Sequence, residues 1–303
     1  MISIDFCFAW SWPYDADFAA QLAAACKDQQ ISYLEITPAN LSPTLEQIAE
    51  GNLRLGAFFD RASDAEISFL PIVEWANQQA LHYINRSWLA RRSWDKASMH
   101  AAITRNGLDA PYTLILPPHK SNPELPNLDL DPLGDCFAIK PAHGGAGQGV
   151  ILGGRSWDDV RHARQQFPED QYLLQAQVKP VMIKDRPAWF RIIYCTENLY
   201  PCWWDPTTHV YTQINQIEID GYSFNPLVEI IHRIARLSQL DLFSSEIALT
   251  QEGRFLVVDY INDPIDLRPQ SRVIQGVPDL MMKAIASDLA GYVASNCGKK
   301  IYI

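Results

Sequence analysis

The stretch that most limits the fold is Phe137–Leu152, which reads FAIKPAHGGAGQGVIL. An apolar strand pattern ends in Lys140 and Pro141, a loop of small residues follows, and a second apolar strand pattern begins at Val150. No Lys-Ser or Lys-Thr pair follows the glycines and no helix signal starts there, so a P-loop is excluded. The fold must therefore hold a glycine-rich loop between two strands.

Length and charge set broad limits on the protein class. The chain has 303 residues, 48% of them hydrophobic, which allows one large or two ordinary domains. A net charge of −10 disfavours nucleic acid and anionic membranes as partners. No run of about 18 uncharged apolar residues predicts a membrane span. The first residues carry Asp5 and no basic segment, which favours a first strand over a signal peptide.

Cysteine spacing predicts the redox environment. The six cysteines form no CxxC pair and no zinc-type cluster with histidine. Free thiols in a reducing compartment are therefore expected, and with them a cytoplasmic location.

Strand and helix patterns divide the chain into two parts. In residues 1–93 strand patterns alternate with helix patterns, which predicts a small parallel α/β sheet. No GxGxxG follows the first strand, so a dinucleotide site there has no support. Beyond residue 93, strands paired as hairpins dominate, as in LFSSEIALT and RFLVVDYIND joined across QEG. The expected fold class is α/β followed by α+β.

Helix signals in the second part are clear. A helix is expected from Asp95 to Arg105, ended by Asn106-Gly107, and another after the N-cap Ser156. NPLVEIIHRIARLSQL predicts an amphipathic helix, and PDLMMKAIASDLAGYVASN a closing one.

The glycine loop and its lysine have a chemical interpretation. Glycines permit positive φ and close approach of backbone N–H groups to an anion. Lys140, just before the loop, is expected to reach a phosphate. The alternative is a flexible hairpin with a surface lysine. The candidate glycines are Gly144, Gly145, Gly147 and Gly149.

Two carboxylates in the later hairpin are candidate metal ligands. Glu246 and Asp259 lie in otherwise apolar strands, where a carboxylate is costly unless it is paired or bound to a metal. Mg²⁺ prefers such hard oxygen ligands. Asn262 would add a neutral oxygen, but a regular strand places it on the opposite face from Asp259, and only a bulge would bring them together. Asp263 and Asp266 are alternative ligands or turn residues.

Taken together in this order, the motifs resemble those of the ATP-grasp superfamily. SWDK resembles its first nucleotide-contacting lysine, Lys96, and FAIKPA its second, Lys140; HGGAGQGV resembles its glycine-rich lid loop. YLLQAQV resembles the hinge strand beside the adenine, and AWFRIIY the strand whose arginine faces the phosphates, here Arg191. The hinge residues are Gln175, Gln177 and Val178. The asparagine spacing departs from the family, which has one residue between acid and asparagine; here two intervene.

The resemblance implies a domain arrangement. Residues 1–93 would form the small pre-ATP-grasp domain and residues 94–303 the ATP-grasp domain, with a lid subdomain at about 110–172 and a core subdomain at about 173–303.

The resemblance also implies an activity. It implies an ATP- and Mg²⁺-dependent ligase, with Mn²⁺ as an alternative ion, that joins a small-molecule or peptide carboxylate to an amine through an acyl phosphate. Arg191 and Arg268 would act on the phosphates and the second substrate, although a structural ion pair is the alternative for Arg191. A homodimer is compatible with the family. Two other functions stay open: a kinase on the same fold, and a non-catalytic nucleotide sensor, which the unusual asparagine spacing supports.

Overall fold

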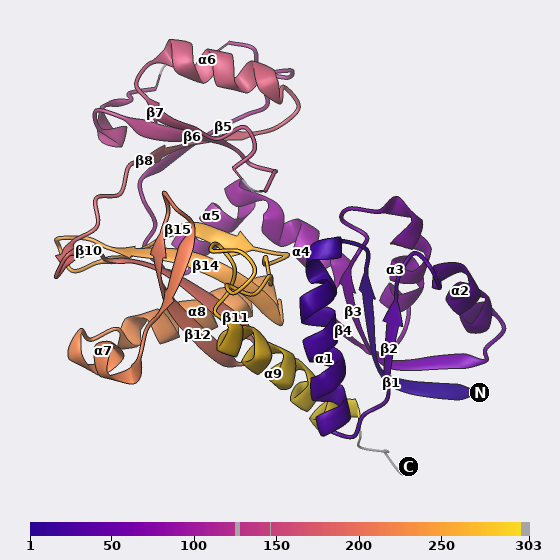
Figure 1. The fold of residues 1–303 in the computed structure, drawn as a ribbon. Helices are drawn as coiled ribbons and strands as arrows, with labels where there is room; N and C mark the ends of the chain where they lie inside the picture. The colour runs from indigo at the N-terminus through magenta and orange to yellow at the C-terminus, as the bar shows by residue number, and fades with distance from the viewer. Residues whose placement is uncertain (125–127, 146, 298–303) are drawn as a thin grey trace.

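The computed structural model describes residues 1–124, 128–145 and 147–297. Three larger sheets surround a central junction: an N-terminal sheet, a core sheet and a lid sheet above the core (Figure 1); β9 (Met182–Ile183) and β10 (Arg186–Pro187) form a further two-stranded antiparallel sheet. The fold class expected from the sequence is confirmed: a parallel α/β sheet precedes the antiparallel sheets.

The N-terminal sheet has the strand order β2-β1-β3-β4, and all its pairs are parallel. Side chains alternate across β1, so that Phe6 and Phe8 enter one hydrophobic cluster and Cys7 and Ala9 another. Helices α2 and α3 cover the second cluster, and α1 covers the first. The elements are β1 (Ile2–Trp10), α1 (Ala16–Asp28), β2 (Tyr33–Ile36), α2 (Leu41–Ala49), β3 (Leu53–Arg61), α3 (Leu70–Asn77) and β4 (His82–Ile84).

Two helices lead from this sheet to the lid. They are α4 (Ser87–Trp94) and α5 (Lys96–Arg105). Asp95 caps α5 by accepting from the backbone N–H groups of Ala97 and Ser98, and Gly107 follows the helix with φ +69°. Both helix ends match the sequence expectation. The expected domain boundary at residue 93 lies in the last turn of α4.

The lid is an antiparallel sheet of order β5-β8-β6-β7, with α6 on one face (Figure 1). Ser156 caps α6 in a capping box with Asp159, as expected. All five residues of β8 pair within this sheet, so the expected lid–core division at residue 172 falls at its first residue. The elements are β5 (Thr113–Leu116), β6 (Phe137–Pro141), β7 (Ile151–Gly154), α6 (Trp157–Gln166) and β8 (Tyr172–Ala176).

The core is an antiparallel sheet of order β13-β12-β11-β14-β15. Helices α4, α5 and α8 pack on one of its faces. The elements are β9 (Met182–Ile183), β10 (Arg186–Pro187), β11 (Trp189–Cys195), β12 (Asn198–Asp205), β13 (Val210–Gln213), α7 (Gln216–Gly221), α8 (Asn225–Ser238), β14 (Leu242–Leu249), β15 (Phe255–Asn262) and α9 (Asp279–Cys297).

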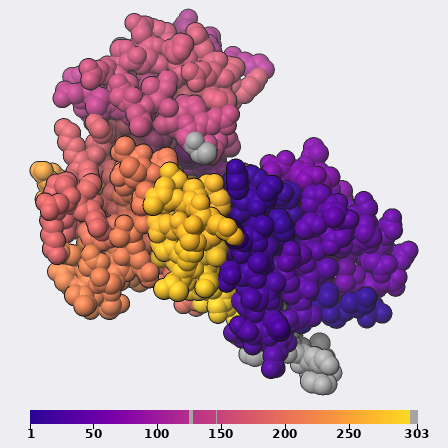
Figure 2. Space-filling view, viewed as in Figure 1, coloured from indigo at the N-terminus to yellow at the C-terminus, as the bar shows by residue number. Residues whose placement is uncertain are grey.

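The C-terminal helix α9 joins the N-terminal sheet to the core. Ile285 and Leu289 lie in one buried cluster with Phe8 of β1 and Ile193 of β11. Figure 1 shows α9 between the two sheets beside α1, and Figure 2 shows its yellow surface against the indigo surface of the N-terminal part. Helix α9 therefore covers the lower part of one core-sheet face and leaves the upper part of that face for other contacts.

Candidate functional site

The upper part of that core-sheet face carries the predicted charged residues. Arg191 on β11 pairs in register with Glu246 on β14, and Glu246 pairs with Asp259 on β15. Residues directly opposite on neighbouring strands project on the same side of the sheet. The structure therefore brings the predicted arginine and both predicted carboxylates together.

Arg191 makes several contacts there. Its guanidinium donates to Ser244 Oγ at 3.0 Å and to Glu246 Oε1 at 3.4 Å. It also lies 4.6 Å above the ring of Trp204 and 5.7 Å from that of Tyr211, both within cation–π range. Burial opposes its charge, but Tyr211 and the carboxylate of Glu246 raise the pKa of Arg191. The guanidinium is therefore a fixed cation in the face of the sheet.

Two bulges in β15 change how the candidate metal ligands on this strand are placed relative to β14. Glu246 pairs with Asp259 while Ser244 pairs with Asn262, so β15 has one residue more than β14 in this interval. The bulge turns Asn262 toward Asp259, and Asn262 Nδ2 donates to Asp259 Oδ2 at 2.7 Å. Asp259 and Asn262 thus meet despite their unusual spacing.

These three side chains fit a hard cation better than a transition metal. They offer two carboxylates and one amide oxygen, the donor set that Mg²⁺ uses with phosphate oxygens and water. Burial raises the pKa of Glu246, and Arg191 opposes the increase. Across the described ranges, no group of three or more His, Cys, Asp or Glu side chains could hold a metal ion by itself.

The alternative acidic ligands have other partners. Asp263 accepts from Asn85 Nδ2 at 2.7 Å and from Trp94 Nε1 at 3.3 Å. Asp266 forms a two-pronged ion pair with Arg268, whose guanidinium lies 4.6 Å from the ring of Tyr14. Neither carboxylate pairs in register with β14, so Asn262 is the better candidate for a third ligand.

Lys140 approaches the same place from the lid. Its ammonium on β6 donates to Gln175 Oε1 at 2.7 Å. Burial lowers the pKa of Lys140, whereas Asp259 and Glu246 act electrostatically to raise it. The other predicted lysine, Lys96, acts electrostatically to lower the pKa of Lys140.

Gln175 connects the lid to the core. Its side chain is only 2% exposed, and its Nε2 donates to Tyr260 Oη at 3.2 Å. Tyr260 Oη also bonds His100 Nδ1 at 2.7 Å, and burial lowers the pKa of His100. Sequence reasoning missed this Tyr260–His100 pair, because the contact joins α5 to β15 across 160 residues.

The glycine loop lies beside Lys96. Lys96 Nζ donates to the backbone oxygen of Gly144 at 2.6 Å, and the Lys96 N–H donates to the oxygen of Ala142 at 2.9 Å.

Gly147 and Gly149 have φ of +74° and +70°, which favours glycine there. Gly145 has no positive φ. Ala146, within the predicted loop, lies outside the described residues.

The hinge residues lie where the chain leaves the lid. Gln177 is exposed and Val178 half-buried, just after β8 ends at Ala176. The chain then joins the core through a bridge between Pro180 and Thr250. Adenine contact at the hinge stays a prediction.

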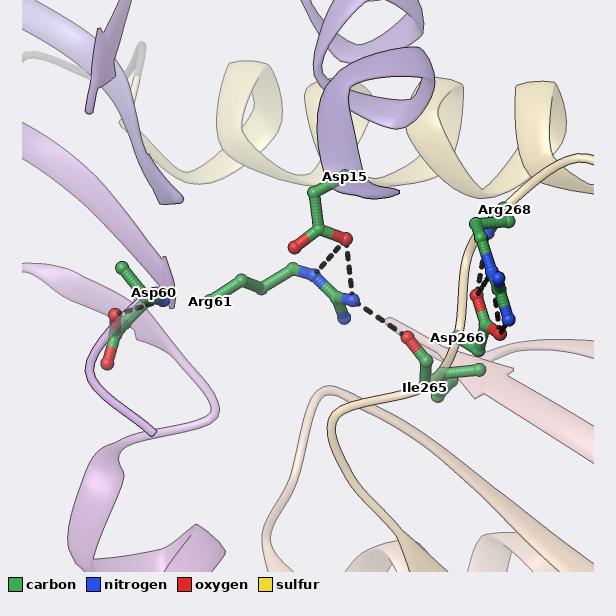
Figure 3. A network of polar contacts seen from close by, with 7 residues as sticks. Asp15, Asp60, Arg61, Ile265, Asp266 and Arg268 are labelled. Carbon is green, nitrogen blue, oxygen red and sulfur yellow. Dashed lines mark hydrogen bonds and ion pairs between the residues drawn. The ribbon is translucent and has the colours of Figure 1, made fainter. Parts of the chain in front are cut away.

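Arg268 lies at the boundary with the N-terminal part of the chain: its guanidinium is 4.6 Å from the ring of Tyr14, and Figure 3 shows it beside Asp266. A buried ion pair holds that boundary: Arg61 Nη2 lies 2.8 Å from Asp15 Oδ1 and donates to the backbone oxygen of Ile265, also at 2.8 Å. Asp60 lies beside Arg61 at the end of β3 and accepts from the N–H groups of Ala62 and Ser63. The segment that carries Arg268 is therefore fixed against the N-terminal part.

An antiparallel core with paired acidic strands, beneath an antiparallel lid that carries a lysine and a glycine hairpin, is the ATP-grasp fold. No protein-family model and no curated protein sequence matches the chain. Solved structures do match it over nearly its full length. The resemblance indicated by the sequence motifs is confirmed at the level of the fold.

Three solved structures illustrate the similarity. One is the ATP-grasp ligase PsnB complexed with precursor peptide PsnA2 and AMPPNP, with a TM-score of 0.62, 12% identity, and coverage of 98% of this chain and 99% of that chain. Another is a RimK domain ATP-grasp protein from Sphaerobacter thermophilus, with a TM-score of 0.61, 17% identity, and coverage of 97% of this chain and 100% of that chain. The third is D-alanine–D-alanine ligase from Bacillus anthracis, with a TM-score of 0.65, 12% identity, and coverage of 98% of this chain and 97% of that chain.

Proposed function

We propose that this chain is an ATP- and Mg²⁺-dependent ligase that joins a carboxylate to an amine. The observation that carries the proposal is the convergence of Lys140 from the lid with Arg191, Glu246 and Asp259 of the core sheet. Solved ligases with this fold include complexes with ADP and Mg, and with a precursor peptide. These complexes support ATP and Mg²⁺ as ligands of this chain and a peptide as a candidate class of substrate.

The proposed reaction has two steps. A substrate carboxylate attacks the γ-phosphate of ATP, the bond to ADP breaks, and an acyl phosphate forms. An amine then attacks the acyl carbon, phosphate leaves, and the amine loses a proton as the amide forms. Both steps depend on positioning and on stabilising negative charge, so they need no nucleophilic side chain.

The residues of the site have distinct proposed roles. Lys96 and Lys140 neutralise phosphate charge; at about 4 Å and an effective dielectric constant near 20, each charge pair is worth about 4 kcal/mol before desolvation. Arg191 stabilises the transferred phosphoryl group. Mg²⁺, when bound, screens charge between phosphate oxygens, and Glu246 and Asp259 would hold it with Asn262.

The glycine loop and the arginine of the boundary segment complete the proposal. The backbone of Gly144, Gly145, Gly147 and Gly149 would lie over the phosphates and exclude water, which protects an acyl phosphate from hydrolysis. Arg268 is proposed to meet the second substrate, since its segment lies between the core sheet and the N-terminal sheet (Figure 3).

A thermal-shift titration tests the nucleotide site. Mg-ATP at about a hundred times its dissociation constant adds about 2.7 kcal/mol to stability, a rise of several degrees. Lys140→Ala should lose this shift, and the control Lys120→Ala, an exposed lysine paired with Glu169, should keep it. No shift in folded wild-type protein contradicts the proposal.

A second assay separates a ligase from a kinase. ADP release is measured with pairs of carboxylates and amines, with each partner alone, and with hydroxyl acceptors. Release that needs both carboxylate and amine supports the ligase. Release with a hydroxyl acceptor alone indicates a kinase, and a nucleotide shift without any turnover indicates a sensor.

A further inference from the structure

A separate pocket lies at the other end of the core strands. It has a volume of about 240 Å³. Four parts of the chain surround it: β4, α4, the turn between α8 and β14, and α9. This volume suits a molecule smaller than a typical drug-sized ligand. Its lining includes His82, Ile84, Arg86, Leu89 and Asp241.

The carboxylate of Asp241 is the unusual group in this lining. The Asp241 backbone N–H donates to Asn85 Oδ1 at 2.9 Å, and its backbone oxygen accepts from Thr196 at 2.7 Å. The Asn85 backbone N–H supplies a hydrogen bond to its carboxylate, and the two carboxylate oxygens keep further acceptor positions for another donor. Burial raises the pKa of Asp241 to about 6. A partly desolvated carboxylate at a pocket wall is best satisfied by a donor that enters the pocket.

One fixed cation, the Arg86 guanidinium, lies on the same pocket wall as Asp241. Arg86 and His82 both act electrostatically on Asp241, but neither forms a hydrogen bond with it. The Arg86 guanidinium donates to the Leu81 backbone oxygen at 3.0 Å and lies 5.7 Å from the Tyr83 ring, which fixes its position. Most of its N–H donors therefore remain for another acceptor.

The pocket is too far from the candidate active site to be part of it. Asp241 immediately precedes β14, and Glu246 follows five residues further along that strand. At about 3.3 Å per residue, the two backbones are about 16 Å apart. A molecule held by Asp241 is not within bonding distance of a group held beside Glu246.

We propose that this pocket binds a small α-amino acid. Its ammonium group contacts the Asp241 carboxylate and its carboxylate contacts the Arg86 guanidinium, with the side chain against Ile84 and Leu89. A ligand that carries both charges matches a lining with the Asp241 carboxylate and the Arg86 guanidinium, since an ion of one sign would satisfy only one of these two groups.

The experiment measures ligand-induced stabilisation of the full chain without nucleotide. Each of the common L-amino acids is titrated by thermal shift, and any that acts is followed by calorimetry. The matched probes are the corresponding α-hydroxy acid, which lacks the ammonium group, and the amine, which lacks the carboxylate. The expected result is that at least one amino acid stabilises the protein and that both of its matched probes bind at least tenfold more weakly.

Variants identify the pocket as the site. Asp241→Asn and Arg86→Gln should each weaken binding at least tenfold, and Arg91→Gln, exposed on the same helix, should leave it unchanged. The ligand-free unfolding transition of all three variants should stay cooperative, which shows intact folding and keeps this result independent of the ligase proposal. The inference is overturned if no amino acid stabilises wild-type protein, if a matched probe binds as well, or if both pocket variants bind normally.

Discussion

The side-chain amide of Gln175 is bonded at both ends. Its oxygen accepts from Lys140 at 2.7 Å and its Nε2 donates to Tyr260 at 3.2 Å, so one residue of the lid orients the lysine and contacts the core. A hydrogen bond to a charged group contributes about 1.5–3 kcal/mol. At the residue scale, the position of Lys140 therefore depends on a neutral neighbour.

Replacing this neighbour tests the dependence. Gln175→Leu removes the acceptor for Lys140, and we expect the dissociation constant of the non-hydrolysable analogue AMPPNP to rise about tenfold, which is about 1.4 kcal/mol. Calorimetric titration measures it. Gln177→Ala, two residues away and exposed, is the control. Equal affinities for wild type and Gln175→Leu would show that Lys140 needs no such support.

Asp241 gives a pH prediction at the same scale. Its folded-state pKa of about 6 lies above its ordinary value of 3.8, so between these values the folded chain binds more protons than the unfolded chain. Its contribution to stability therefore falls as pH rises through 6. Asp241→Asn should exceed wild type in unfolding free energy by at most about 3 kcal/mol at pH 7.5.

Urea unfolding at a series of pH values measures the difference between Asp241→Asn and wild type. The difference should narrow steadily from pH 7 to pH 4, because the wild-type carboxyl becomes neutral like the amide. A difference that does not change with pH would contradict the raised pKa.

At the element scale, the lid hairpin depends on particular glycines. A Cβ at Gly149 would lie 2.5 Å from a ring carbon of Phe167, and the backbone has φ +70°. A Cβ at Gly145 would meet nothing within 4 Å, and no positive φ applies there. The two positions in one loop therefore have opposite tolerance for a side chain.

Alanine substitutions at Gly149 and Gly145 test whether the two positions differ in their tolerance for a side chain. Gly149→Ala should lower the unfolding free energy by at least about 1–2 kcal/mol, the ordinary cost of a left-handed residue, with the Phe167 clash in addition. Gly145→Ala should stay within about 0.5 kcal/mol of wild type. Chemical denaturation measures both, and equal losses would place the constraint elsewhere in the loop.

Elements with a strong local pattern were predictable from the sequence. The capped helices α5 and α6 and the β14–β15 hairpin follow from caps, periodicity and the QEG turn. Helix α2 was not predicted; Pro43 lies in its first turn, where its missing N–H costs nothing.

The site was predictable in its residue types but not in its register. Lysine, arginine and acid motifs identify Lys140, Arg191, Glu246 and Asp259, yet the position of Asn262 depends on a bulge set by pairing with β14. Asn85 has no local signal at all, because it donates to Asp263 across 178 residues. Such contacts depend on tertiary packing, which a linear pattern does not encode.

At the scale of the whole molecule, a few buried polar contacts join the N-terminal sheet to the core. Arg61 is 5% exposed and Asp15 2%, and Arg61 also bonds the Ile265 backbone (Figure 3). None of the helices in the described ranges combines the length and the apolar character that a membrane span requires. The boundary between the sheets is thus polar at one point within a largely apolar contact.

A double-mutant cycle tests this ion pair. Arg61→Met leaves the Asp15 carboxylate buried without its partner and should cost about 3–5 kcal/mol of unfolding free energy. Adding Asp15→Asn removes the uncompensated charge and should recover a large part of that loss. Urea denaturation of the four proteins gives the coupling energy, and losses that simply add would show that the two side chains act independently.

The position of α9 also has a consequence for how the chain is made. Strand β4 completes the N-terminal sheet at Ile84, but the apolar face with Phe8 is covered in part by Ile285 and Leu289 of α9. The ribosome must add the 213 residues from Asn85 to Cys297 first, which takes about 10 to 40 s at roughly 5–20 residues per second. During that interval the nascent chain exposes this face, and it is then a binding surface for chaperones that recognise apolar segments.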